Sequence, residues 1–357
     1  VGLVVCRQEC LYSALYTENN VKSAHIQLME GNKGPVKAVL VNSGNANACN
    51  PTGVEDAADI RRLSTKKLGV RENELAVAST GIIGRPIDVD KIVELSEKAY
   101  ENLASSAQAS LDAADAIRTT DSHPKVFSTE SGGIQVGGIC KGAGMIDPSL
   151  ATMICVLTTN ARLTQNELDE ALMQAADESF NMVCVDGDQS TNDTVMLLSS
   201  QRKECGLDEF KRLLSTVCIE LARMVAFDGE GATKQITITV KGADSSNKAR
   251  LAVKSLSRSP LVKTAFYGEN PNWGRIMSTL GSKISFDWEK TTITYGAGGE
   301  GYTVVDCGCG MELAPAKEIL KNKHLELTVE LGEGDESATG WTCDLSEEYV
   351  RINAGYS

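Results

Sequence analysis

Two patterns of hydrophobic and polar residues alternate along the chain: short runs rich in β-branched residues, and polar stretches whose apolar residues recur at helical spacing. The most regular helical stretch covers residues 208–225, where apolar side chains fall on one face and charged ones on the other. A second helix is predicted after Thr164, because Thr164 and Glu167 match the pattern of a capping box. Helices are also predicted at residues 55–68 and 88–103.

Short apolar runs predict β-strands, and several are apolar throughout. They cover residues 36–41, 74–78, 134–136, 152–158, 182–185, 194–198, 235–240, 284–286 and 325–330, and the N-terminal run at 2–5 is also strand-like. Strands that are apolar on both faces must be covered on both sides, which favours a layered α/β sandwich over a helical bundle. The long helix ends in a glycine-rich segment, so we expect a sandwich domain at 1–230 and a smaller α+β domain at 231–357.

Length, charge and hydropathy narrow the classes of function. A chain of 357 residues is long enough for about two domains. The net charge of −13, without a clustered Lys/Arg run, argues against a nucleic-acid partner, since that binding depends on positive side chains. No apolar run is long enough to cross a bilayer, so a membrane-spanning role is excluded.

The cysteines indicate a reducing compartment. Eleven of them are dispersed along the chain, and Cys155, Cys184 and Cys218 sit inside apolar strand or helix patterns, which predicts buried, reduced thiols of a cytoplasmic protein. The close pair Cys307 and Cys309 has no second pair and no histidine nearby, so no metal site is predicted. No targeting segment is visible at the N-terminus.

The segment at 141–160 is the densest in candidate chemistry. A glycine loop that begins at Lys141 leads through Pro148 to Thr152, at the mouth of a predicted buried strand. One interpretation is structural, because threonine is common at strand starts and Gly and Pro are ordinary turn residues. The other is that Thr152 is a nucleophile whose base is its own α-amino group, freed by cleavage of the Ala151–Thr152 bond. This second interpretation agrees with the absence of a Gly-x-Ser-x-Gly elbow and of a histidine in a glycine-rich loop.

A Thr80-Gly81 pair follows the predicted strand at 74–78. The default interpretation is a strand that ends in a turn. The functional alternative is that the hydroxyl of Thr80 and a backbone N–H at Gly81 stabilise an oxyanion, since glycine lets a substrate approach the backbone. Residues 41–47, with three asparagines, fit either an Asx-turn network or a loop that lines a site.

Three further segments predict no reaction by themselves. Residues 186–193 have carboxylates at a spacing like that of a calcium loop, but they lack the required glycine and glutamate, so metal binding is not expected. Residues 228–234 place Glu230 between glycines that also fit a helix C-cap. Residues 270–275 contain a tryptophan and an arginine that fit a packing corner.

Taken together and in this order, these segments resemble the ornithine acetyltransferase family, which includes glutamate N-acetyltransferase and the bifunctional arginine-biosynthesis enzyme. The resemblance covers nearly the whole chain. The strings that carry it are Asn42-Ser-Gly-Asn-Ala-Asn-Ala-Cys, Ser79-Thr-Gly-Ile-Ile-Gly, Lys141-Gly-Ala-Gly-Met-Ile, Ala151-Thr-Met, Asp186-Gly-Asp with Ser190-Thr-Asn-Asp-Thr, Asp228-Gly-Glu-Gly-Ala-Thr-Lys, Pro271-Asn-Trp-Gly-Arg and Tyr349-Val-Arg-Ile-Asn-Ala. Each string alone is weak, but the fixed order is specific.

The resemblance implies the α-β-β-α sandwich of self-cleaving, N-terminal-nucleophile enzymes of the aminopeptidase type. It implies cleavage between Ala151 and Thr152, a nucleophilic Thr152, and an oxyanion pair at Thr80 and Gly81. The implied substrate contacts are Thr119 or Thr120, Lys141, Thr152, Glu230, Asn353 and Ser357. The C-terminus departs from the family, which usually has an Asp after the alanine that follows Asn353 and a Thr or Ser at its end.

The implied activity is transfer of an acetyl group from N2-acetylornithine to glutamate through an acetyl-threonine, with acetyl-CoA left open as a further donor. No metal or redox cofactor is expected. The two cleaved pieces are expected to pair as a heterodimer and to assemble into a heterotetramer, with the C-terminal tail returning to the active site. A hydrolase of the same architecture is the alternative enzyme, and a non-catalytic binding protein on the same sandwich is the alternative outside enzymes.

Overall fold

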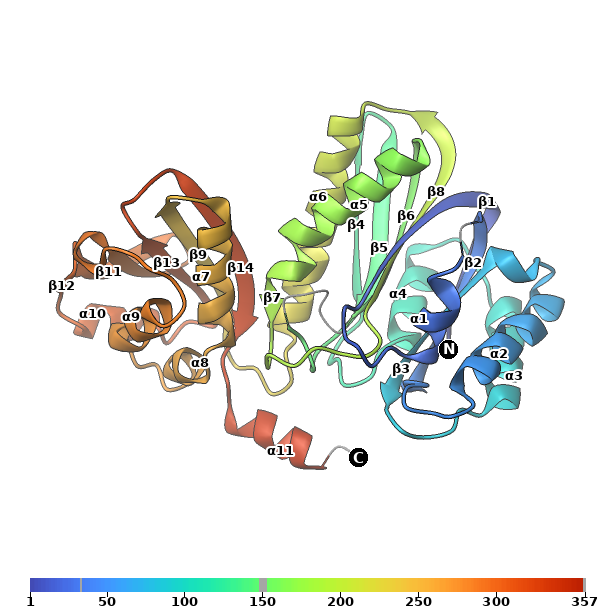
Figure 1. Cartoon of the computed structure of the whole chain (residues 1–357), viewed down its shortest axis with the longest axis horizontal. Coiled ribbons are helices and arrows are strands. Elements are labelled where there is room, and N and C mark those ends of the chain that lie inside the picture. Colours follow the sequence, from blue (N-terminus) through green and yellow to red (C-terminus); the bar gives the residue numbers. More distant parts are fainter. Residues whose placement is uncertain (33, 148–152, 356–357) are drawn as a thin grey trace. The chain divides into compact units, whose positions relative to one another are not determined.

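The computed structural model of the chain describes residues 1–32, 34–147 and 153–355 (Figure 1). It divides into two compact units, Val1–Asn181 with Asp188–Val225, and Met182–Gly187 with Ala226–Ser357. This division differs from the expected domains at 1–230 and 231–357, because residues 182–187 cluster with the second unit. The reason is that β7 (Val183–Cys184) pairs in parallel with β14 (Glu336–Cys343).

The first unit contains seven strands in the order β3-β2-β1-β8-β6-β5-β4. They are β1 (Gly2–Tyr16), β2 (Val36–Asn45), β3 (Leu75–Ile82), β4 (Lys125–Ser131), β5 (Ile134–Lys141), β6 (Ile154–Arg162) and β8 (Thr194–Glu204). The first half of β1 pairs with β2 and its second half with β8, with an irregularity between Val5 and Cys10. A single long strand therefore takes part in two sets of paired strands.

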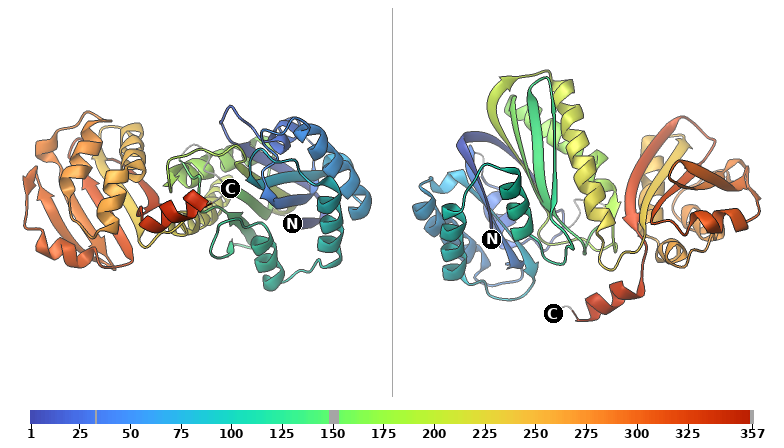
Figure 2. Two further views of the ribbon diagram at one scale, coloured as in Figure 1. Left: turned by 90° about the horizontal axis from the view of Figure 1, so that it is seen from below. Right: turned by 180° about the vertical axis from the view of Figure 1, so that it is seen from behind.

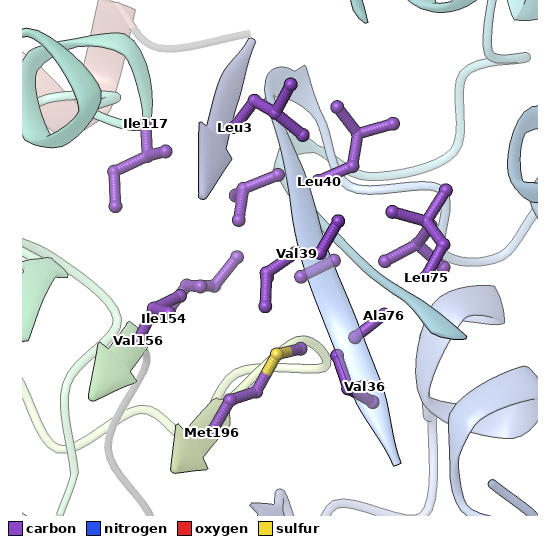
Figure 3. Packing of buried hydrophobic residues seen from close by; sticks show 14 of the residues in the cluster. Leu3, Val36, Val39, Leu40, Leu75, Ala76, Ile117, Ile154, Val156 and Met196 are labelled. Carbon is purple, nitrogen blue, oxygen red and sulfur yellow. The ribbon is translucent and has the colours of Figure 1, made fainter. Parts of the chain in front are cut away.

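These two sets of strands pack against each other through apolar side chains. Figure 3 shows Ile154, Val156 and Met196, from β6 and β8, directed toward Val36 and Val39 of β2. All five side chains are buried in one cluster. The inner faces of β1–β3 and of β6 and β8 thus form a common hydrophobic core.

Helices cover the outer faces of these two layers (Figure 1, Figure 2). α2 (Gly53–Leu68) contacts β3 and α3 (Val89–Glu101), while α5 (Gln165–Glu178) contacts β1, and Leu221 of α6 (Leu207–Phe227) packs beside Gly138 of β5. α1 (Ala24–Met29), α4 (Ala107–Ala116) and the 3-10 turns η1 (Glu72–Glu74) and η2 (Phe180–Met182) complete the helical elements. The predicted α-β-β-α sandwich is confirmed.

Local sequence explains the start of α5 and the burial of α6. The Thr164 hydroxyl accepts from the Glu167 N–H at 3.4 Å, and the Glu167 carboxylate accepts from the Thr164 N–H at 2.8 Å, as the capping box predicts. In α6, the predicted apolar face is buried, including Phe210, Leu214 and Val217. The helical spacing of these residues therefore identified the core-facing side correctly.

The second unit is a seven-stranded sheet in the order β12-β11-β10-β13-β9-β14-β7, packed with helices. Its remaining strands are β9 (Gln235–Ala243), β10 (Thr292–Ala297), β11 (Glu300–Asp306), β12 (Cys309–Gly310) and β13 (His324–Glu330). Its helices are α7 (Ser246–Arg258), α8 (Pro260–Tyr267), α9 (Trp273–Gly281), η3 (Trp288–Lys290), α10 (Ala314–Ile319) and α11 (Glu347–Gly355), and α7 lies against β9 and β14. Among the described helices of both units, none is long and apolar enough to cross a membrane.

One predicted strand is wrong. Residues 284–286 form no strand and lie between α9 and η3. Ile284 and Phe286 instead line an apolar pocket together with Trp273 of α9. The apolar residues of this short segment therefore border a pocket that they share with α9, whereas the sequence pattern attributed them to a sheet.

Candidate active site

The candidate site of the first unit lies where four strand ends come together. β5 ends at Lys141, opposite Ile154 at the start of β6, and Ile154 lies opposite Thr194 at the start of β8. The end of β3 contributes Thr80, whose hydroxyl accepts a hydrogen bond from the Lys141 ammonium at 3.3 Å. Two predicted site residues are thus in contact, one from β3 at one end of the strand order and one from β5, next to the other end.

Gly81 occupies a position that admits no side chain. Its φ is +133°, and a Cβ atom would lie 2.2 Å from the carbonyl carbon of Gly44 and 2.5 Å from the nitrogen of Asn45. Gly44 and Gly81 are paired in the parallel β2–β3 ladder. Glycine is therefore required here both by its conformation and by the close approach of β2, and this packing positions the adjacent Thr80.

Lys141 is a buried cation with one acceptor among the described residues. Lys141 is only 3% exposed. The one hydrogen-bond acceptor of its ammonium in that part of the chain is the Thr80 hydroxyl. Burial lowers the pKa of Lys141, and the nearby charge of Asp121 partly opposes this shift. An ammonium carries three protons, so this one is suited to bind a carboxylate or a developing oxyanion.

Asp121 is a buried carboxylate beside this lysine. Its Oδ1 accepts from the Lys125 ammonium at 2.7 Å and from the Gly142 N–H at 2.6 Å. Burial alone would raise its pKa, but the charges of Lys141 and Lys125 and these hydrogen bonds lower the pKa of Asp121 to about 2. It is therefore ionised at any pH where the protein would work.

The predicted threonines of the 118–121 loop lie next to this carboxylate. The Thr119 N–H donates to Asp121 Oδ2 at 3.2 Å, and Arg118 donates to the Asp121 carbonyl at 2.7 Å. Thr119 and Thr120 are both half-buried. Both are thus close to the Lys141 segment, and both stay candidates for substrate contact.

Ser79, the residue before Thr80, is held by three hydrogen bonds. Its N–H donates to His25 Nδ1 at 3.3 Å, its carbonyl accepts from Asn192 Nδ2 at 2.7 Å, and its hydroxyl donates to Asn42 Oδ1 at 2.6 Å. All of these side chains are buried. The strand end that carries Thr80 is therefore fixed from three directions.

His25 acts in this arrangement as a neutral imidazole. Because Nδ1 accepts from Ser79, Nε2 carries the proton and donates to the Thr194 hydroxyl at 3.0 Å. Burial lowers the pKa of His25 from 6.5 to about 3. Such a weak base is poorly matched to proton transfer near neutral pH, so His25 positions the backbone and the hydroxyl that it contacts.

The chain is also fixed at Met153. Its N–H donates to Asp193 Oδ1 at 3.1 Å, and its carbonyl accepts from the Thr194 N–H at 2.9 Å. Met153 directly follows Ala151 and Thr152, the predicted cleavage site and nucleophile, which lie outside the described residues. The residue after the predicted nucleophile is thus anchored at the same strand ends as Lys141.

In the second unit, Glu230 and Asn353 are brought together. The Asn353 amide donates to Glu230 Oε2 at 2.8 Å, and both side chains reach solvent. Gly231 has a φ of +69°, and a Cβ there would lie 2.5 Å from the nitrogen of Tyr349, at the start of α11. The close approach of Gly231 to α11 therefore brings this pair into contact. Ser357, also predicted to contact substrate, lies outside the described residues.

Several residues of the first-unit site were not predicted as site residues. Asp121 and Lys125 lie in and just after a loop without hydrophobic periodicity, where the one available signal is their spacing of four residues. His25 and Asn192 come from distant segments that meet only in the fold.

Elsewhere in the 186–193 segment, Asp186 accepts from the Tyr349 hydroxyl at 3.3 Å. Across the described ranges, no three His, Cys, Asp or Glu side chains form a group that could hold a metal ion.

Comparisons with known proteins agree with this arrangement. The model of the ArgJ family matches residues 1–357. The chain is 42% identical to a protein named glutamate N-acetyltransferase from Methanothermobacter thermautotrophicus, and 40% identical to one named arginine biosynthesis bifunctional protein ArgJ from Symbiobacterium thermophilum. Each comparison covers 100% of this chain and 92% of the relative.

A solved structure supports the same relationship. The crystal structure of arginine biosynthesis bifunctional protein ArgJ from Bacillus halodurans is 35% identical, with a TM-score of 0.51. The match covers 56% of this chain and 97% of that one. By its full-length match and these relatives, the chain belongs to the ArgJ family.

Proposed function

We propose that this protein transfers the acetyl group of N2-acetylornithine to glutamate, a step of arginine biosynthesis, through an acetyl ester on Thr152. The family and the names of its relatives support the reaction. The observation that carries the proposal is the buried Lys141 ammonium, hydrogen bonded to Thr80 at the strand ends where Met153 is anchored. This places a cation and a hydroxyl beside the segment that carries the predicted nucleophile.

The proposed oxyanion site follows from hydrogen-bond direction. An ammonium can only donate, so Thr80 Oγ1 must be the acceptor in its contact with Lys141. The hydroxyl proton of Thr80 is then directed to another acceptor, and the positive charge nearby makes it a better donor. With the backbone N–H of Gly81, it can stabilise the negative charge of a tetrahedral intermediate.

The first half-reaction forms the acyl-enzyme. The α-amino group of Thr152 takes the hydroxyl proton, and Oγ1 attacks the acetyl carbonyl of acetylornithine. The tetrahedral intermediate collapses, its C–N bond breaks, and the proton passes to the departing amine of ornithine. In the second half-reaction, the amine of glutamate attacks the ester and Thr152 regains its proton. The reaction balances without a metal or redox cofactor.

The charged groups support binding of zwitterionic substrates. Both acetylornithine and glutamate carry an α-carboxylate, which we assign to Lys141 and to Thr119 or Thr120. Glu230 with Asn353 is assigned to the cationic end of ornithine, and Ser357 to a further contact from the C-terminal tail. Acetyl-CoA as a second acetyl donor to glutamate belongs to the same proposal, as the relatives named bifunctional suggest.

Self-cleavage is part of the mechanism, because the nitrogen of Thr152 is a base only once it leaves the peptide bond. The cut between Ala151 and Thr152 gives pieces of 151 and 206 residues. In support, the Bacillus halodurans chain is matched over 97% of its length yet covers 56% of this chain, as expected of a piece of similar size. We propose that the two pieces stay paired as a heterodimer and assemble into a heterotetramer.

The proposal includes a cytoplasmic location. All eleven cysteines are free thiols, which is their usual state in a reducing compartment.

A steady-state experiment tests the reaction. Ornithine release from acetylornithine is measured at several glutamate concentrations, and acetylglutamate is measured in the same samples. We expect glutamate to raise ornithine release, one acetylglutamate per ornithine, and parallel double-reciprocal lines. Ornithine release that is independent of glutamate, with free acetate as the product, would identify a hydrolase. Intersecting lines would replace the covalent intermediate with a ternary complex, and absence of turnover would indicate a binding protein.

A further inference from the structure

Asp121 connects three segments of the first unit. It lies between α4 and β4 and binds Thr119 of its own loop, Lys125 at the start of β4 and Gly142 after β5. The side chains of Asp121 and Lys125 have no exposed surface. Because burial of a charge is unfavourable unless it is compensated, an ionised carboxylate in this position holds its donors firmly around it.

The same carboxylate acts on Lys141. Burial and the charge of Lys125 lower the pKa of Lys141, whereas Asp121, Cys140 and Asp193 raise it, Asp121 most strongly. Gly142, which donates to Asp121, is the next residue in the chain after Lys141. Asp121 thus acts on Lys141 both through its charge and through the position of the neighbouring backbone.

We propose that Asp121 is a positioning residue for acetyl transfer, which fixes Thr119 and Gly142 around the site and maintains the positive charge of Lys141 between substrates. The proposal rests on the proposed function, in which Lys141 binds the substrate carboxylate. It adds a residue that touches no substrate and acts through the groups that do. Its negative charge opposes the effect of burial on the Lys141 ammonium, without a hydrogen bond between the two side chains among the described contacts.

A structural ion pair between Asp121 and Lys125 is the competing explanation. Such a pair would hold the loop against β4 without controlling the charge of Lys141. Two substitutions separate the explanations, Asp121→Asn and Lys125→Gln, because each removes one charge of the pair at similar volume. Asp121 raises and Lys125 lowers the pKa of Lys141, so the two variants are expected to shift it in opposite directions.

The experiment combines titration with kinetics. Lysine side chains are labelled with carbon-13 at Cε, and the Lys141 signal is identified by its loss in Lys141→Met. The signal is titrated by NMR in wild type and both variants, and kcat/KM for acetylornithine is measured over the same pH range. Asp115→Asn is the matched control, since it removes a carboxylate from the end of α4 that is 56% exposed and paired with Arg118.

In Asp121→Asn, we expect the Lys141 midpoint and the alkaline limb of kcat/KM to fall by about one pH unit or more. In Lys125→Gln, the Lys141 midpoint and the alkaline limb should both move to higher pH. In Asp115→Asn, neither the midpoint nor the limb should move. Equal loss of activity at every pH, with no shift of the midpoint, would overturn the proposal. So would shifts of the same sign in Asp121→Asn and Lys125→Gln, or a shifted midpoint with an unshifted rate profile.

Asp121→Asn removes the carboxylate charge that the buried Lys125 ammonium contacts at 2.7 Å, which can prevent folding. In that case a double variant with Asp121→Asn and Lys125→Gln is made, which removes both charges of this buried pair. The Lys141 midpoint of the double variant must then lie below that of Lys125→Gln alone, and an equal midpoint would refute the role of Asp121. If the wild type transfers no acetyl group, the proposed function fails, while the titration still reports whether Asp121 controls Lys141.

Discussion

Lys141 in the first unit and Lys234 in the second are both buried lysines next to glycine-containing segments, but their ammonium groups have different surroundings. Lys234 donates to the Glu269 carboxylate at 2.8 Å and to the backbone carbonyls of Leu320, Lys321 and Asn322 at 2.8 to 3.3 Å. Lys141 donates to one threonine hydroxyl at 3.3 Å. Within residues 1–32, 34–147 and 153–355, four acceptors surround the ammonium of Lys234 and one accepts from that of Lys141.

Another buried lysine of the second unit follows the pattern of Lys234. Lys263 donates to the Thr342 hydroxyl at 2.8 Å and to the carbonyl of Cys343. Carbonyl acceptors fix a lysine as part of the fold, whereas a sparsely bonded buried ammonium can exchange its partner for a ligand. The comparison therefore teaches that saturation of the ammonium, more than its burial, separates a structural lysine from a functional one.

The largest expected effect comes from the paired substitutions Lys141→Met and Lys234→Met. Loss of the cation that polarises Thr80 of the oxyanion site and binds the substrate carboxylate should lower kcat/KM of Lys141→Met by about 100- to 1,000-fold, with little loss of stability. Lys234→Met should instead lower the free energy of unfolding by about 1–3 kcal/mol, because it leaves carbonyl groups without a donor. Urea unfolding and kinetics on both variants measure the difference. Unfolding of Lys141→Met, or full activity in it, would contradict the comparison.

Glycine substitutions test the backbone of the same site. Gly81→Ala should lose about 2–5 kcal/mol of stability, since overpacking costs about 1–3 kcal/mol and a disfavoured backbone conformation adds about 1–2. Gly84→Ala is the control, because Gly84 has a φ of +79° with nothing within 4 Å of its Cβ position. It should lose only about 1–2 kcal/mol. Equal losses of stability in the two variants, measured by thermal unfolding, would show that the contact of residue 81 with β2 is unimportant for stability.

A smaller effect is expected from Glu230 and its partner. Glu230→Gln keeps the size of the side chain and removes its charge, so KM for acetylornithine should rise about tenfold or more, as for one lost charged hydrogen bond. Stability should change by no more than about 0.5 kcal/mol, because the side chain reaches solvent. Glu347→Gln, in exposed α11, provides a control of equal charge. An unchanged KM in Glu230→Gln would remove this residue from the substrate site.

His25 adds a pH dependence to the stability of the first unit, which is small at neutral pH and grows as the pH falls. The pKa of His25 is about 3 in the folded protein and about 6.5 in the unfolded chain, so the unfolded chain binds the extra proton between these values. Stability should therefore decline as the pH falls from about 6.5 toward 3, by up to about 1.4 kcal/mol per pH unit. His25→Gln should show a shallower decline in urea unfolding at pH 7, 6 and 5. An unchanged slope would mean that His25 is protonated in the native state.

The sequence pattern predicted those parts of the fold in which one element buries its own regular face. The helix at 208–225 and the strands at 36–41 and 194–198 are examples, because their apolar periodicity records their burial. β14 was not predicted, since residues 336–343 read as mostly polar and small and are placed by pairing with β9. The wrong strand at 284–286 has the opposite cause, because its apolar residues line a pocket beside α9 and pair with no strand.

The residues of the candidate site also divide into those that were predicted from the sequence and those that were not. Thr80 and Gly81 lie at a strand end, where local sequence indicates a close approach of the backbone, and they were predicted from it. Lys141 was predicted as a site residue through the family resemblance.

His25 was not predicted, because its partners come from segments that are distant along the chain. Asp121 was not predicted, because its loop has no hydrophobic periodicity and its contact with Gly142 forms only in the fold. The His25–Thr194 bond spans 169 residues, and no local pattern records such a contact.

The central claim is that Thr152 becomes the N-terminal residue of a cleaved chain and then carries the acetyl group. Intact mass spectrometry under denaturing conditions tests it most directly, on protein incubated with acetylornithine before and after addition of glutamate. The account predicts two pieces of 151 and 206 residues, the larger beginning Thr-Met-Ile-Cys and heavier by one acetyl group until glutamate is added. Thr152→Ala should stay one inactive, unmodified chain. A fully active protein that remains uncut, or an acetyl group that persists after glutamate is added, would contradict the account.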